Sequence, residues 1–172
     1  MSLPCLPLRL CALASLLALG ACAMGLNNPT VTAGESESAV ISRLGKPTAV
    51  YPDGQDHLLE YRTNPGGQAT YMVRMDSGGH ARGMEQVLTS QKFATIKPGT
   101  DTKDSVLRKV GAPYETSYLS LSRQDVWTYM YRDQGVWDNL MHVQFGPDGK
   151  VSSLLNAPDL WRRPAAGGGH GM

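Results

Sequence analysis

The sequence predicts an α+β fold made of two tandem units, each with short helices packed on an antiparallel sheet of three to four strands. The first observation behind this is a repeat, in which Val40–Pro47 (VISRLGKP) aligns without gaps with Val106–Pro113 (VLRKVGAP). The second is the glycine and proline that end each copy, and the third is an apolar alternation of period two in the segments that follow. Recurrence of such a pattern indicates one supersecondary unit used twice.

Each copy begins with the pattern of a short helix. Ser36 and Thr102 are expected to be N-caps, because their hydroxyl groups can accept the free amides of a first turn. Gly45 and Gly111 supply a residue that tolerates positive φ at the helix end, and a proline two positions later stops continuation. Between the copies, Thr89 is expected to cap another short helix, which buries a phenylalanine.

The strand half of each unit follows its first helix. We expect strands at 126–132, 140–145 and 151–155 in the second copy, and at 57–62, 69–75 and 81–88 in the first. Glycine-rich turns join the last two strands of each copy. These segments align at a larger offset than the helices do, which we interpret as a four-residue insertion within 114–125.

The start of the chain has the pattern of an exported lipoprotein. Of the 172 residues, 1–21 are predicted to be a signal peptide, because the apolar run that follows Arg9 is too short to cross a bilayer. Leu19-Gly-Ala-Cys22 resembles a bacterial lipobox, which implies lipidation of Cys22, and no Asp follows it, which implies the periplasmic face of the outer membrane. The alternative is ordinary cleavage near this cysteine and a soluble product.

The remaining sequence divides into four segments. A lipid-anchored tether over 22–33 precedes a first unit at 34–88 and a second unit at 89–160. The glycine-rich end, 161–172, is expected to be disordered.

Composition argues against several classes of function. Past residue 21, 15 basic residues balance 15 acidic ones, so bulk charge gives no reason to expect nucleic-acid binding. All three cysteines precede residue 23, and the four histidines lack the spacing of metal ligands. No Gly-x-Ser-x-Gly motif or free thiol marks a nucleophile. We therefore expect no metal, no cofactor and no catalytic residue, and predict that the chain is not an enzyme.

Several short motifs in fixed order resemble the SmpA/OmlA (BamE-like) family of outer-membrane lipoproteins. They are Ile96–Gly99, Thr102, Val106, Val110–Pro113, Trp127-x-Tyr129-x-Tyr131-Arg132, Val143-x-Phe145 and Gly149–Val151. The resemblance implies non-catalytic protein binding, as an accessory to envelope or outer-membrane protein assembly, with the β-barrel assembly machinery as a candidate partner. Two units instead of one are closer to tandem β-lactamase-inhibitor-like proteins, so the alternative is a periplasmic inhibitor or sensor that binds a soluble hydrolase.

Aromatic residues are the candidates for partner contact. Trp137 is predicted to be partly exposed in a polar loop over 133–139, and Tyr129 lies on the aromatic face of a strand. On the same strand face, Trp127 and Tyr131 are expected to pack in the core.

Overall fold

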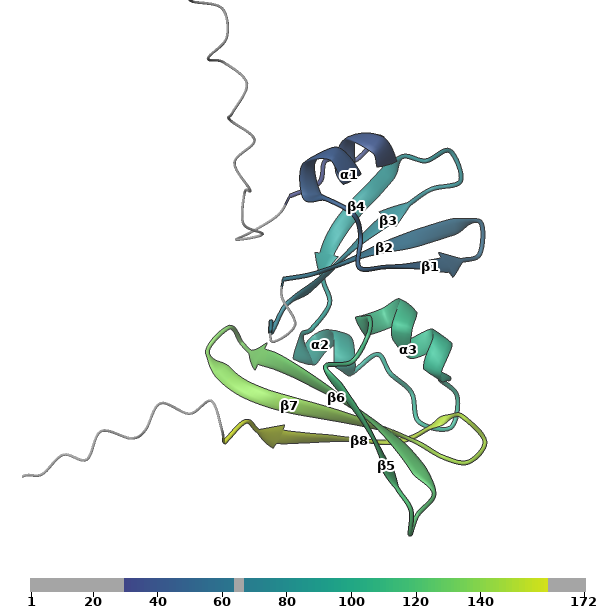
Figure 1. Ribbon diagram of the computed structural model, residues 1–172, viewed down its shortest axis with the longest axis vertical. Helices are drawn as coiled ribbons and strands as arrows, with labels where there is room; N and C mark the ends of the chain where they lie inside the picture. Colours follow the sequence, from purple (N-terminus) through teal and green to yellow (C-terminus); the bar gives the residue numbers. More distant parts are fainter. Residues whose placement is uncertain (1–29, 64–66, 161–172) are drawn as a thin grey trace, which may run out of the picture.

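The computed structural model describes residues 30–63 and 67–160 (Figure 1). The predictions for the signal peptide, for Cys22 and for the tail over 161–172 lie outside the described residues. Within the described ranges, no helix is long and apolar enough to cross a membrane. The fold is α+β, with two four-stranded antiparallel sheets and few short helices, as the sequence predicts.

The chain forms two units, each with one sheet and the short helices that precede it in the sequence. Unit 1, as used below, consists of α1 (Glu37–Leu44), β1 (Ala49–Asp53), β2 (Asp56–Arg62), β3 (Thr70–Met75) and β4 (Ala81–Gln86). Unit 2 consists of α2 (Ser90–Phe93), α3 (Lys103–Val110), β5 (Glu115–Leu119), β6 (Gln124–Asp133), β7 (Trp137–Phe145) and β8 (Val151–Pro158). Both sheets are simple meanders, in which each strand pairs with its neighbours in sequence. Figure 1 shows α2 and α3 between the two sheets.

The helix ends follow the sequence prediction. The hydroxyl of Ser36 accepts a hydrogen bond from the amide of Ala39 at the start of α1, and Thr102 accepts one from Ser105 at the start of α3. The residues after the two helices, Gly45 and Gly111, have φ values of 86° and 80°. These positive values explain why glycine ends both helices.

Equivalent contacts recur in the two units. Arg43 pairs with Glu35 across α1 at 2.8 Å, and Lys109 pairs with Asp101 across α3 at 2.5 Å. Both members of the second pair occupy the positions that the helix repeat makes equivalent to the first. The segment before each helix also binds the start of the last strand. The amide of Ala81 donates to the carbonyl of Glu35 in unit 1, and the amide of Val151 donates to that of Asp101 in unit 2. The same local device therefore fixes each helix on its sheet.

Strand register corrects the predicted position of the insertion. Leu59 pairs with Val73 as Trp127 pairs with Val143, so Leu59 is the structural equivalent of Trp127, whereas the sequence alignment places His57 there. Two extra residues lie in the turn between β5 and β6, and two more lengthen the hairpin of β6 and β7. The total of four inserted residues is confirmed, but only two of them lie within 114–125, so the predicted position is wrong for the other two.

Two edge strands were not predicted. Both β1 and β5 lack the apolar alternation that marked the other strands, because neither contributes a buried residue. Their presence completes four strands in each sheet.

A separate core lies under the helices of each unit. In unit 1 the buried cluster is Val40, Leu59, Tyr61, Val73, Met75 and Ala81. The larger cluster of unit 2 gathers around Phe93, whose ring meets those of Tyr129 and Tyr131 edge to face at 5.6 Å and 5.1 Å. The expectation that Phe93 and Tyr131 are core residues is confirmed.

Candidate functional site at the junction of the units

A buried acid joins the two units. Glu60 lies in β2 with its side chain on the opposite face from Leu59 and Tyr61, which pack under α1, and it is fully buried. Its carboxyl group accepts hydrogen bonds from Tyr51 at 2.6 Å and Thr48 at 3.3 Å. A third bond, at 3.0 Å, comes from the backbone amide of Ala112 in unit 2. Such a network satisfies an acid that would otherwise be costly to bury.

The helix end that meets Glu60 has no room for a side chain. A Cβ built on Gly111 would lie 2.8 Å from the Glu60 carboxyl oxygen and 3.1 Å from a methyl group of Thr70. At the equivalent position, a Cβ on Gly45 would meet nothing within 4 Å. Glycine is therefore needed at position 111 for two reasons: its backbone has a positive φ, and the two units approach too closely there for a side chain.

Burial affects the tyrosines around this junction. Burial, together with the hydrogen bond to Glu60, raises the pKa of Tyr51 above its ordinary range. Burial also raises the pKa of Tyr129, whose hydroxyl donates to the carbonyl of Gly111 at 3.0 Å. Both phenols therefore remain protonated donors at neutral pH.

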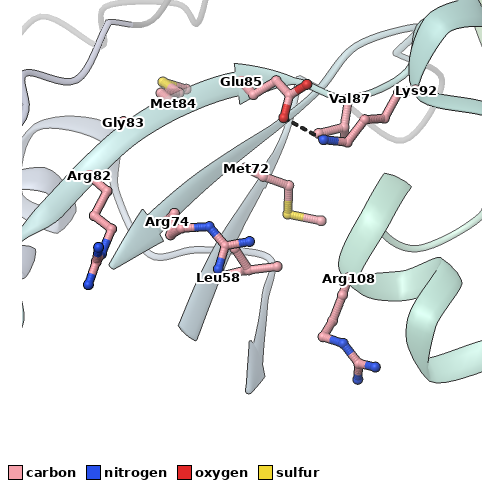
Figure 2. Close-up of a pocket in the computed structure, with 10 residues that line it drawn as sticks. All are labelled: Leu58, Met72, Arg74, Arg82, Gly83, Met84, Glu85, Val87, Lys92 and Arg108. Atoms are coloured by element: carbon pink, nitrogen blue, oxygen red, sulfur yellow. Dashed lines mark hydrogen bonds and ion pairs between the residues drawn. The ribbon is translucent and has the colours of Figure 1, made fainter. Parts of the chain in front are cut away.

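Beside the junction lies a groove on the face of the first sheet that α3 only partly covers (Figure 2). It has a volume of about 270 Å³. The apolar side chains of Leu58, Met72 and Val87 form a buried cluster beneath it. Four basic side chains, Arg74, Arg82, Lys92 and Arg108, surround this apolar surface.

Carboxylates already face these four cations. Arg74 contacts Asp53 at 2.5 Å and Lys92 contacts Glu85 at 2.6 Å. The other two make longer contacts, Arg82 with Asp56 at 3.3 Å and Arg108 with Asp53 at 3.7 Å. Because each positive charge has an internal partner, the groove offers an apolar surface with a polar rim rather than an anion site.

A second polar contact links the units near Trp137. The side-chain amide of Gln68 donates to Asp138 at 2.7 Å, and its oxygen accepts from Arg132 at 3.3 Å. Asp138 and Arg132 lie opposite each other near the tip of the β6–β7 hairpin, one pair away from the pair that closes its turn. Gln68 therefore fixes this hairpin against unit 1.

Trp137 is exposed, as predicted, but its setting differs from the predicted loop. It is the first residue of β7 and pairs with Asp133, so the loop shrinks to 134–136. Its side chain is 65% exposed, beside Val136 at 67%. The tip of this hairpin thus presents two apolar residues with no core to bury them.

Tyr129 must be corrected as a candidate contact. It is 1% exposed and belongs to the core cluster of unit 2. The alternation of side chains along β6 points Tyr129 toward α2, and its hydroxyl donates a hydrogen bond to the carbonyl of Gly111. A partner that left the fold intact could not reach it.

Sequence reasoning missed Glu60 and Gln68, which connect the units. Glu60 had one visible signal, its position directly after two consecutive apolar residues in a strand. Such a pair indicates burial on both faces of the sheet. Gln68 had none, because its partners come from a hairpin far along the chain.

Among the described residues, no group of three or more His, Cys, Asp or Glu side chains could hold a metal ion. His57 bonds Glu37 at 3.0 Å and His142 bonds Thr128 at 2.9 Å, so these two histidines have ordinary polar partners.

No protein-family model matches the chain, and no curated protein matches it significantly. Among solved structures, the chain is similar to a DUF4309 family protein (YjgB) from Bacillus subtilis, at 16% identity over 72% of this chain and 78% of that one. The TM-score is 0.30, and a likeness this weak supports no statement about fold or function.

Proposed function

We propose that this chain is a non-catalytic, protein-binding accessory that works in envelope or outer-membrane protein assembly. Its two units are BamE-like in this proposal, and the lipid on Cys22 holds them at the periplasmic face of the outer membrane. The barrel-assembly machinery is the candidate partner. The motifs over 96–151 and the Leu19–Cys22 lipobox support this proposal from the sequence.

One structural observation supports it most directly: the exposed Val136 and Trp137 at the tip of a hairpin that Gln68 fixes in place. Tryptophan is enriched among the residues that dominate protein interfaces. A preorganised hairpin loses little conformational freedom when a partner covers it. The pair can therefore act as an anchor for a partner protein.

The alternative, inhibition of a soluble hydrolase held between the units, has less geometric support. The direct contacts of Glu60 with Ala112 and of Gln68 with Asp138 occupy part of the space between the sheets. A hydrolase would have to use the groove edge rather than a cleft that spans both units.

A photo-crosslinking residue in place of Trp137, in cells, tests the binding proposal. Leu155 on β8 is the matched control, since it is a 55% exposed apolar residue on another strand. We expect a specific adduct with an envelope assembly protein from position 137 and none from 155. Adducts with a single soluble hydrolase would favour the alternative, and equal labelling from both positions would contradict an anchor at Trp137.

Membrane fractionation tests the anchor separately. Cys22→Ala should leave the protein soluble or as an uncleaved precursor, because no acyl chain can attach. A variant that is processed normally and stays with the outer membrane would show that the lipobox interpretation is wrong.

A further inference from the structure

Among the described residues, the edges of β4 and β8 are bound by another segment at their first residue and β1 is blocked by a proline, whereas no described segment binds the edge of β5. At β4 and β8, the strand start is bound by the segment that precedes a helix: Gly34 donates to Ala81 at 2.7 Å, and Gly99 donates to Val151 at 2.8 Å. At β1, the edge contains a proline, Pro52, and contacts α3. Proteins commonly protect edges by such devices, because unpaired backbone groups invite another strand.

The edge of β5 is open to solvent. All five residues of this strand are exposed, so no described segment of the chain covers it. Large apolar side chains gather along it and in its turn: Tyr114, Tyr118, Leu119 and Leu121, with exposures of 50%, 59%, 44% and 102%. A solvent-exposed group of this kind at a sheet edge marks an interaction surface.

Hydrogen bonding shows which backbone groups of β5 are free. The amide of Tyr114 donates to the carbonyl of Thr128 at 2.8 Å, so Thr128 directs its backbone groups toward β5. Thr128 pairs with Glu115, and antiparallel ladders alternate, so the amides and carbonyls of Thr116 and Tyr118 point away from the sheet. Two donors and two acceptors are thus available to another strand.

The equivalent edge in unit 1 lacks one of these groups. Thr48 donates to Glu60 at 2.7 Å in the same way, so Val50 and Pro52 take the outward positions of β1. Pro52 is the counterpart of Tyr118 when the helix repeat is continued into these strands, and proline has no amide to donate. Of two equivalent edges, one is therefore blocked at the position where the other is open.

We infer that the free edge of β5 binds an extended strand of a partner protein, with apolar side chains on both faces of that strand. Tyr118 and Leu119 point to opposite faces, so the bound strand must offer an apolar contact to each. Both lie in the second half of β5, whereas Glu115 begins it. Two copies could pair all four free backbone groups of β5 only in the antiparallel register that sets Thr116 opposite Tyr118. That register places Leu119 opposite Glu115, an apolar side chain against a charged one, which favours a different protein over a second copy.

This inference rests on the proposed protein-binding function but concerns a different end of the sheet. Trp137 begins the second strand of the β6–β7 hairpin, while the β5–β6 turn lies at the other end of β6. If no strand binds at β5 while crosslinking from Trp137 still succeeds, this inference is overturned and the proposed function is not. Failure of both would overturn the proposed function as well.

The test uses the purified full chain and a synthetic peptide with the β6 sequence, QDVWTYMYRD, which has apolar residues on both faces and pairs with β5 in the protein. We expect the peptide to slow hydrogen exchange at the Thr116 and Tyr118 amides. A peptide with proline replacing its central tyrosine should not. Protection at β1, β4 or β8 instead, or no protection, would overturn the inference.

Variants of the edge separate backbone from side-chain contributions. Tyr118→Pro copies the proline of β1 and should weaken peptide binding about tenfold or more, while Tyr118→Lys keeps the amide and tests the edge if the proline variant fails to fold. Val50→Lys on β1 is the matched control and should bind as the parent does. Unchanged affinity in both Tyr118 variants would overturn the inference, as would dimerisation of the chain that Tyr118→Pro abolishes.

Discussion

The carboxyl group of Glu60 in unit 1 accepts a hydrogen bond at 3.0 Å from the backbone amide of Ala112, which follows the last helix of unit 2. A fully buried acid thus binds the amide of a residue that lies two positions beyond the end of α3, outside the helix. The same group also holds Tyr51 and Thr48 of its own unit. Glu60 therefore couples the stability of one unit to the position of the other.

Replacement of Glu60 should show this coupling. Glu60→Leu leaves the amide of Ala112 and the hydroxyl of Tyr51 without an acceptor, and each unsatisfied buried group costs about 1–3 kcal/mol. Glu60→Gln retains an acceptor and the shape, so it should cost about 1 kcal/mol. Urea unfolding measures both. Equal losses in the two variants would contradict a network that depends on accepted hydrogen bonds.

The two helix-end glycines give a matched pair. Gly45→Ala and Gly111→Ala both place a side chain at positive φ, which costs about 1–2 kcal/mol. Only Gly111→Ala also drives a methyl group against Glu60 and Thr70, and overpacking adds about 1–3 kcal/mol. We expect the excess loss at Gly111 in the free energy of unfolding. Identical losses would show that the units separate without cost.

Acid should weaken the attachment of α3. Burial raises the pKa of Asp101, but hydrogen bonds from Lys109, from the amide of Lys97 and from Ser105 outweigh it, so the pKa lies below its ordinary value of 3.8. A carboxyl group with a lowered folded pKa stabilises the protein above its unfolded pKa, and this contribution is lost as the pH falls through the folded value.

The measurement is the free energy of unfolding between pH 6 and pH 2. We expect it to fall below about pH 4, where unfolded chains begin to bind the proton that folded Asp101 resists. Asp101→Asn should be less stable at pH 6 and should show a shallower acid decline. A variant with the same acid slope as the parent would show that other carboxyl groups cause the decline.

Local signals in the sequence were enough for the helices and for every strand except β1 and β5. Ser36 and Gly45 delimit α1 because a cap and a residue with positive φ act on neighbouring backbone alone. The edge strand β5 carried no such signal, since exposed strands need no apolar alternation. Its existence depends on pairing with β6, which is a tertiary contact.

The alignment error has the same origin. Tyr61 and Tyr131 match by letter, but register relates Tyr61 to Tyr129, because two of the inserted residues lie beyond this strand position. Residue identity alone cannot place an insertion between two similar hairpins. A tertiary contact also explains why Tyr129 was wrongly expected to be a partner contact. Its strand was predicted, but its burial depends on packing against Phe93 of α2, which the strand pattern does not show.

Truncation of the two tryptophans in unit 2 should have very different effects on the stability of the protein. The ring of Trp127 packs against Phe145 at 4.8 Å, with Lys103 6.0 Å from its centroid, so Trp127→Ala should cost about 3 kcal/mol and lower the melting temperature by several degrees. Trp137, 65% exposed, should change stability by about 0.5 kcal/mol or less when replaced by alanine. Calorimetry on the two variants measures this. A melting temperature that falls as far for Trp137→Ala as for Trp127→Ala would mean that its indole supports the hairpin, and the surface at Val136 would then have no free anchor.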